Sequence, residues 1–151
     1  MTCECGSVDC RTMAVALGRW ALGVLMFFAG LGKIIGGVGG FVNGYLVPAF
    51  SKTFLPAGLV AAYGYAVPFV ELLVGILLLT GIARNSALML NGVLLISLAF
   101  GQMLLQQHGT VANIFIYILL TMIVLYAGKY DTWVIGCCNR GAGDDKGSCC
   151  G

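Results

Sequence analysis

Long apolar runs separated by short polar or glycine-containing breaks are the dominant pattern of this chain. Four such runs extend over about residues 13–35, 57–81, 86–105 and 111–127. Each run is long enough to cross roughly 30 Å of hydrocarbon at about 1.5 Å of rise per helical residue. Helices are expected rather than strands, because an open strand edge would leave backbone groups unpaired in lipid. The pattern therefore predicts an all-α, four-helix transmembrane bundle.

The stretch over residues 36–56 does not fit this pattern. It begins with Gly36-Gly37-Val38-Gly39-Gly40 and continues through Phe41, Tyr45, Pro48, Phe50 and Phe54. Glycine and proline break it too often for a membrane span, and its aromatic residues make it too apolar to lie free in water. We expect an interfacial Gly/aromatic loop between the first two helices, folded as a short amphipathic or re-entrant lid.

Composition supports an integral membrane protein of a single domain. Of the 151 residues, 60% are hydrophobic and 9% are charged, and mean hydropathy is +0.98. The net charge of +2 argues against a nucleic-acid partner and leaves the lipid bilayer as the first partner. We expect a Cys-rich cytoplasmic segment at 1–12, a four-helix membrane domain at 13–128 and a Cys-rich cytoplasmic tail at 129–151. No removable signal peptide is expected at the N-terminus.

Basic residues predict the orientation of the bundle. Four spans place the two termini and the Arg84 loop on one side of the membrane, and that side would carry Arg11, Arg19, Arg84, Lys129, Arg140 and Lys146. The opposite side would carry only Lys33 and Lys52. Cytoplasmic loops hold the excess of lysine and arginine in membrane proteins. Both termini are therefore predicted to be cytoplasmic.

Glu71 is the one acidic residue inside a predicted span. It precedes Gly81 by ten residues, which places it about 15 Å from the end of its helix, close to the bilayer midplane. A carboxylate at this depth must be protonated, paired or hydrated. Arg19 is the predicted partner, and Lys33, which starts near the opposite face, is the poorer match. The pair would serve either to lock two helices together or to act as a proton relay or ligand-binding carboxylate.

Polar residues recur at helical spacing in the last two spans. Such stripes usually join helices through hydrogen bonds. The functional alternative is a quinone-sized pocket under the residue 36–56 lid, with the single histidine at its mouth. The candidate pocket residues are Gln102, Gln106, His108, Asn113 and Tyr117.

All seven cysteines lie outside the four apolar runs. They are Cys3, Cys5, Cys10, Cys137, Cys138, Cys149 and Cys150. Seven soft ligands would suffice for Zn²⁺, Cu⁺ or an iron–sulfur centre, although their spacing fits no standard motif. The alternatives are lipidation of membrane-proximal thiols and surface cysteines with no specific role. In a reducing cytoplasm, stable disulfides are not expected.

The chain resembles the DoxX family of small four-helix membrane proteins over about residues 13–128. The matching text is Arg19, Phe28-Ala29-Gly30-Leu31-Gly32-Lys33, Val67-Pro68-Phe69-Val70-Glu71-Leu72-Leu73-Val74-Gly75, Leu77-Leu78-Leu79-Thr80-Gly81 and Arg84. The resemblance implies a four-helix bundle. The candidate intramembrane polar site comprises Arg19, Lys33, Glu71 and Arg84. The resemblance also implies partners in sulfur or thiol redox metabolism. The Cys-rich ends do not belong to the DoxX pattern.

Three functions remain open on the sequence. The first is a non-catalytic membrane subunit or anchor of a quinone- or thiol-linked redox complex, with protein partners and a surface thiol cluster. The second is a quinone or thiol oxidoreductase that uses Glu71. The third is a carrier of soft metals or thiol compounds that uses the cysteine doublets. We favour the first, in which the chain is not an enzyme on its own.

Overall fold

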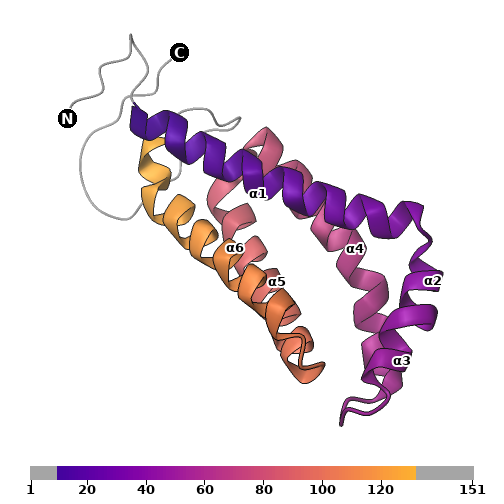
Figure 1. Cartoon of the computed structure of the whole chain (residues 1–151). Coiled ribbons are helices and arrows are strands. Elements are labelled where there is room, and N and C mark those ends of the chain that lie inside the picture. The colour runs from indigo at the N-terminus through magenta and orange to yellow at the C-terminus, as the bar shows by residue number, and fades with distance from the viewer. Residues whose placement is uncertain (1–9, 132–151) are drawn as a thin grey trace.

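The computed structural model describes residues 10–131, and within them the chain is helical (Figure 1). Four helices are long and apolar enough to cross a membrane, namely α1 (Cys10–Ile35), α4 (Ala57–Thr80), α5 (Arg84–Leu104) and α6 (His108–Tyr126). Each lies within three residues of a predicted run. The predicted all-α bundle of four transmembrane helices is confirmed.

The stretch expected to be an interfacial loop is largely helical. Three short helices follow one another directly, α2 (Val38–Phe41), the π-helix η1 (Val42–Leu46) and α3 (Val47–Phe50). We call residues 38–50 the helical arm. Pro48 lies in the first turn of α3, where a missing N–H is tolerated. Periodicity did not reveal the arm, because its glycines mask the apolar side that packs against α4.

The arm and α1 together cover the length of α4. A Cβ built on Gly75 would lie 2.5 Å from the backbone nitrogen of Phe27, and one on Gly30 would lie 2.6 Å from the carbonyl oxygen of Pro68. Nearer the start of α4, a Cβ on Gly64 would lie 2.5 Å from Leu46 in the arm. α1 therefore packs on the C-terminal part of α4, and the arm packs on its N-terminal part.

The break between α1 and the arm occurs at a glycine that a side chain would strain. Gly37 has φ +85°, a conformation that residues with a Cβ rarely adopt. After this break the chain turns away from the axis of α1 and runs beside α4 (Figure 1). Together, α1 and the arm form one broken antiparallel partner of α4.

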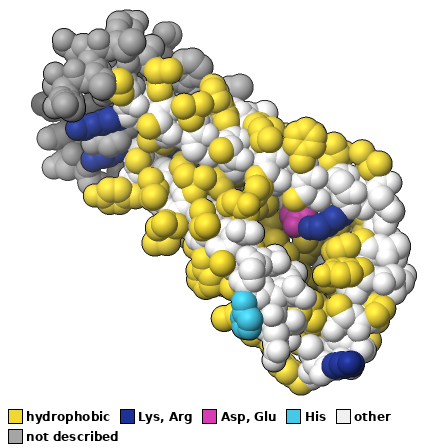
Figure 2. All heavy atoms as spheres, in the orientation of Figure 1, with side chains coloured by type: hydrophobic (Ala, Val, Ile, Leu, Met, Phe, Trp, Pro, Cys, Tyr) yellow, Lys and Arg dark blue, Asp and Glu magenta, His cyan; other side chains and the backbone are white. Residues whose placement is uncertain are grey.

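The core lies where the four long helices meet. Its most deeply buried apolar side chains come from all four, and they include Leu22, Met26, Val74, Leu78, Leu88, Leu95 and Val124. Large hydrophobic side chains also cover much of the outer surface, as Figure 2 shows on one face. This outward-facing apolar surface is the part of an integral membrane protein that contacts lipid.

η2 (Ala127–Tyr130) continues directly from α6 and packs against α1. The described chain therefore begins and ends at the same end of the bundle. The connection between α4 and α5 also lies at this end, because Arg84 contacts the backbone of Asp131.

Candidate functional site: two ion pairs in the membrane domain

Lys33 and Glu71 form an ion pair between α1 and α4. The Lys33 Nζ atom lies 2.6 Å from both carboxylate oxygens of Glu71. The carboxylate is almost fully enclosed, with 2% of its side chain exposed, whereas 25% of the Lys33 side chain is exposed. The Phe41 ring from the arm lies 5.6 Å from Nζ, a cation–π distance. Only the cationic half of this pair is open to its surroundings.

The predicted pairing of Glu71 with Arg19 is wrong. Helix-depth counting assumed that α1 crosses the whole membrane, which would place Lys33 at its far side. In fact Arg19, and not the start of α1, is level with the end of α4, because its guanidinium contacts the carbonyl oxygen of Leu78. Lys33 thus lies at the depth of Glu71, and Arg19 lies about 21 Å away along the same helix.

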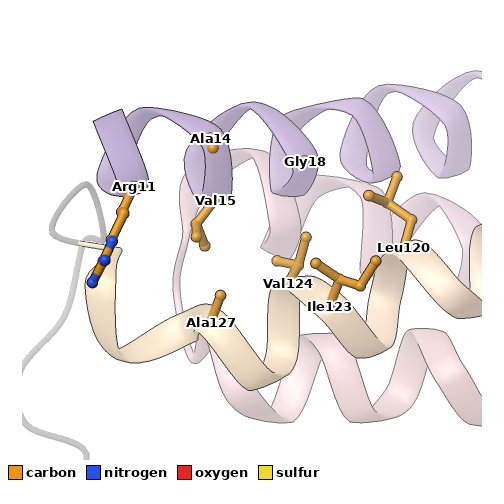
Figure 3. A pocket seen from close by; sticks show the side chains of 8 residues that line it. All are labelled: Arg11, Ala14, Val15, Gly18, Leu120, Ile123, Val124 and Ala127. Atoms are coloured by element: carbon orange, nitrogen blue, oxygen red, sulfur yellow. The ribbon is translucent and has the colours of Figure 1, made fainter. Parts of the chain in front are cut away.

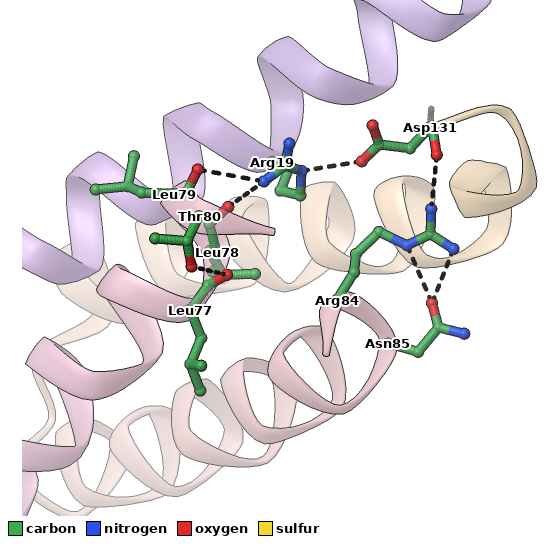
Figure 4. A network of polar contacts seen from close by, with 8 residues as sticks. All are labelled: Arg19, Leu77, Leu78, Leu79, Thr80, Arg84, Asn85 and Asp131. Carbon is green, nitrogen blue, oxygen red and sulfur yellow. Dashed lines mark hydrogen bonds and ion pairs between the residues drawn. The ribbon is translucent and has the colours of Figure 1, made fainter. Parts of the chain in front are cut away.

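Arg19 is instead part of a buried network at one end of the bundle (Figure 4). Its guanidinium Nε donates to a carboxylate oxygen of Asp131 at 2.9 Å, and its Nη1 donates to the carbonyl oxygen of Leu78. A longer contact of 3.5 Å reaches the carbonyl of Leu79. These carbonyls lie in the last turn of α4, where the helix dipole favours a cation. Arg19 therefore binds α1 to the end of α4 and to the segment after α6.

Arg84 belongs to the same network and not to the Glu71 site. Its Nη1 donates to the backbone oxygen of Asp131 at 3.2 Å, and its Nε and Nη2 both lie 3.1 Å from the side-chain oxygen of Asn85. The structure therefore divides the predicted polar site into two parts, with Lys33 and Glu71 in one and Arg19 and Arg84 in the other. Asp131, which sequence reasoning missed, joins the second part.

Further polar contacts join the long helices to one another. The Tyr63 hydroxyl of α4 lies 2.7 Å from the Ser97 hydroxyl of α5, and Tyr63 is within electrostatic range of Glu71. The side-chain amide of Asn91 donates to the Thr121 hydroxyl at 2.9 Å, joining α5 to α6. Thr121 follows Asn113 and Tyr117 at helical spacing, whereas nothing in the sequence distinguished Tyr63 from other aromatic residues.

The five residues of the candidate quinone pocket are not gathered into one site. The side chains of Gln106, His108 and Asn113 are exposed, and those of Gln102 and Tyr117 are half-buried. Within residues 10–131, none of these five side chains makes a hydrogen bond. His108, expected in a loop, is the first residue of α6.

The cysteines fall almost entirely outside the described residues. Cys10 begins α1 and is half-buried, and the other six lie beyond residues 10–131. In the described part of the chain, no group of three or more His, Cys, Asp or Glu side chains is arranged to hold a metal ion. The predicted metal-binding thiol cluster therefore stays a prediction.

A groove of about 290 Å³ separates the start of α1 from the end of α6 (Figure 3). Arg11 lies at one end of it, and the other lining residues are apolar or small, namely Ala14, Val15, Gly18, Leu120, Ile123, Val124 and Ala127. The groove offers packing surface to a hydrocarbon chain but no group that could carry out chemistry.

Comparisons with known proteins overturn the resemblance to DoxX. The family model described as methylamine utilisation protein MauE matches residues 11–113, and neither a curated protein nor a solved structure matches the chain. The motifs that suggested DoxX are short runs rich in glycine and leucine, residues common to many membrane helices. The MauE match covers α1 except for its first residue, the arm, α4 and α5, together with the start of α6. The chain therefore belongs to the MauE family of membrane proteins.

Proposed function

We propose that this protein is a non-catalytic membrane subunit that anchors a redox complex, linked to thiols or quinone, at the bilayer surface. The observation that carries the proposal is the contact of Arg19 with Asp131. It holds the start of α1 beside the segment after α6, so the Cys-rich stretches that adjoin them leave the bundle at the same end. We expect the seven thiols to share this surface, where they would form a docking or thiol-exchange site for a redox partner.

Family membership agrees with this role. The family description refers to methylamine utilisation, and using an amine as a carbon source requires oxidation of its carbon–nitrogen bond. A small membrane protein in such a system can position a redox partner without supplying the catalytic groups. The polar residues of the bundle support the same view, because Arg19, Arg84, Asn91 and Thr121 all serve to join helices.

The test is purification of the full chain from its native membrane in a mild detergent, with and without chemical cross-linking. We expect a partner at fixed stoichiometry, identified by mass spectrometry. A variant with all seven cysteines changed to serine should keep the helical fold by circular dichroism and lose the partner. A wild-type protein that purifies alone, with no cross-linked partner, would contradict the proposal.

A further inference from the structure

We propose that Lys33, held by Glu71, binds the neutral carbonyl head group of a membrane-soluble molecule that enters the bundle from the side. The site lies where α1 breaks, between the arm with α4 on one side and the α5–α6 hairpin on the other. It is independent of the proposed anchoring function, because it involves neither the Cys-rich ends nor the Arg19 network.

The first argument is the unused hydrogen-bonding capacity of Lys33. An ammonium group has three N–H donors, and both hydrogen bonds of Lys33 go to the same carboxylate. Within residues 10–131 no other acceptor contacts Nζ, although a quarter of the side chain is exposed. Glu71 lies about 15 Å from the end of α4, near the bilayer midplane, where lipid offers no acceptor. A ligand oxygen would satisfy this donor.

The second argument is the charge of the site. Lys33 and Glu71 neutralise each other, so a charged ligand would lose its hydration without gaining a counter-ion. A neutral carbonyl avoids this cost and accepts the remaining N–H of Lys33. Ser97 donates its hydroxyl to the carbonyl of Leu94 at 2.7 Å, so Tyr63 is the donor to Ser97 and keeps its oxygen lone pairs. The Tyr63 proton is therefore already used, which leaves Lys33 as the donor to a ligand carbonyl.

The third argument is the shape of the surface. Figure 2 shows an acidic and a basic side chain meeting in a hollow rimmed by hydrophobic side chains. In the Lys33–Glu71 pair the lysine is the more exposed partner, with 25% of its side chain accessible. Farther along α5, a Cβ on Gly101 would lie 3.5 Å from the Phe50 ring, so the arm and α5 approach each other. The hollow thus joins a polar end to an apolar rim, which fits a head group with an alkyl tail.

The experiment uses the full chain in phosphatidylcholine nanodiscs and a photoactivatable probe, 1,4-benzoquinone with a diazirine on a decyl chain. Decylbenzene with the same diazirine is the matched control, because it lacks the carbonyl groups. We expect saturable labelling by the benzoquinone probe on the arm, α4 and α5, suppressed by excess decyl-benzoquinone but not by decylbenzene. Lys33→Met should weaken this labelling roughly tenfold or more, as expected for the loss of one hydrogen bond to a charged group.

The control variant is Lys52→Met, which removes an exposed lysine in the connection between α3 and α4 and should leave labelling unchanged. If Lys33→Met does not fold, the wild-type competition alone decides the question. Labelling that fails to saturate, or that is equal for the two probes, would overturn the proposal. Labelling by the benzoquinone probe that is unchanged in a folded Lys33→Met protein would overturn it as well.

Discussion

Arg19 and Asp131 lie 112 positions apart in the sequence, yet the guanidinium of one donates to the carboxylate of the other at 2.9 Å in a site closed to solvent. Arg84 also contacts the backbone oxygen of Asp131. Asp131 therefore joins α1 and the start of α5 to the end of the described chain. The contact closes the bundle at the end where the described chain begins and ends.

Replacing Asp131 with asparagine should strongly destabilise the protein. The change would remove the carboxylate charge that the buried Arg19 Nε contacts, and breaking a buried ion pair costs about 3–5 kcal/mol. Unfolding followed by circular dichroism in mixed micelles of mild and denaturing detergent would measure the loss. Lys52→Gln, at an exposed position, is the control and should unfold like the wild type. An Asp131→Asn protein with an unchanged midpoint would show that Arg19 does not depend on this partner.

Close packing of α1 on α4 should make Gly75 intolerant of even a methyl group. A Cβ there would lie 2.5 Å from the Phe27 nitrogen and 2.7 Å from its Cα, and backbone atoms cannot move aside as a side chain can. We expect Gly75→Ala to lower the free energy of unfolding by about 1–3 kcal/mol. Gly32→Ala is the matched control, because a Cβ on Gly32 meets nothing within 4 Å. Equal stability of the two variants would refute this packing.

The four long helices were predictable because each is a long apolar run, and the constraint that lipid places on backbone hydrogen bonds leaves few alternatives. Glu71 was recognisable for the same reason, since a charge inside such a run stands out. Its partner was not recognisable. Choosing between Arg19 and Lys33 required knowing how α1 is offset along α4, since Arg19 contacts the last turn of α4 and Lys33 lies beside Glu71.

The arm and Asp131 illustrate what a linear pattern omits. The arm is helical because its apolar side packs against α4, a tertiary contact that its glycines and Pro48 conceal at the level of propensity. Asp131 follows the last apolar run, and its sequence position suggests an ordinary surface acid. Only the return of α6 to the start of α1 brings its carboxylate to Arg19.

The break before the arm should depend on the backbone conformation of Gly37. An alanine at φ +85° is strained, although its Cβ would meet nothing within 4 Å. Any loss of stability in Gly37→Ala therefore reports backbone strain alone. We expect Gly37→Ala to cost about 1–3 kcal/mol in the same detergent titration. Gly40→Ala, also without a neighbour within 4 Å but free of this conformation, should cost less. If the two variants proved equally stable, the break would not depend on the positive φ of Gly37.

Labelling of single thiols should place the two ends of the chain on the same, cytoplasmic side of the membrane. α4 crosses from the connection that contains Lys52 to the end that contains Arg84, so these two positions must lie on opposite sides. In a cysteine-free background, Cys3 or Cys150 restored alone should react with a membrane-impermeant maleimide only after the cells are permeabilised. Lys52→Cys should react in intact cells. Arg84 and Asp131 are in contact, so labelling of Cys3 and Cys150 from opposite sides would contradict the four-crossing topology. Labelling of both thiols in intact cells would reverse only the orientation inferred from basic residues.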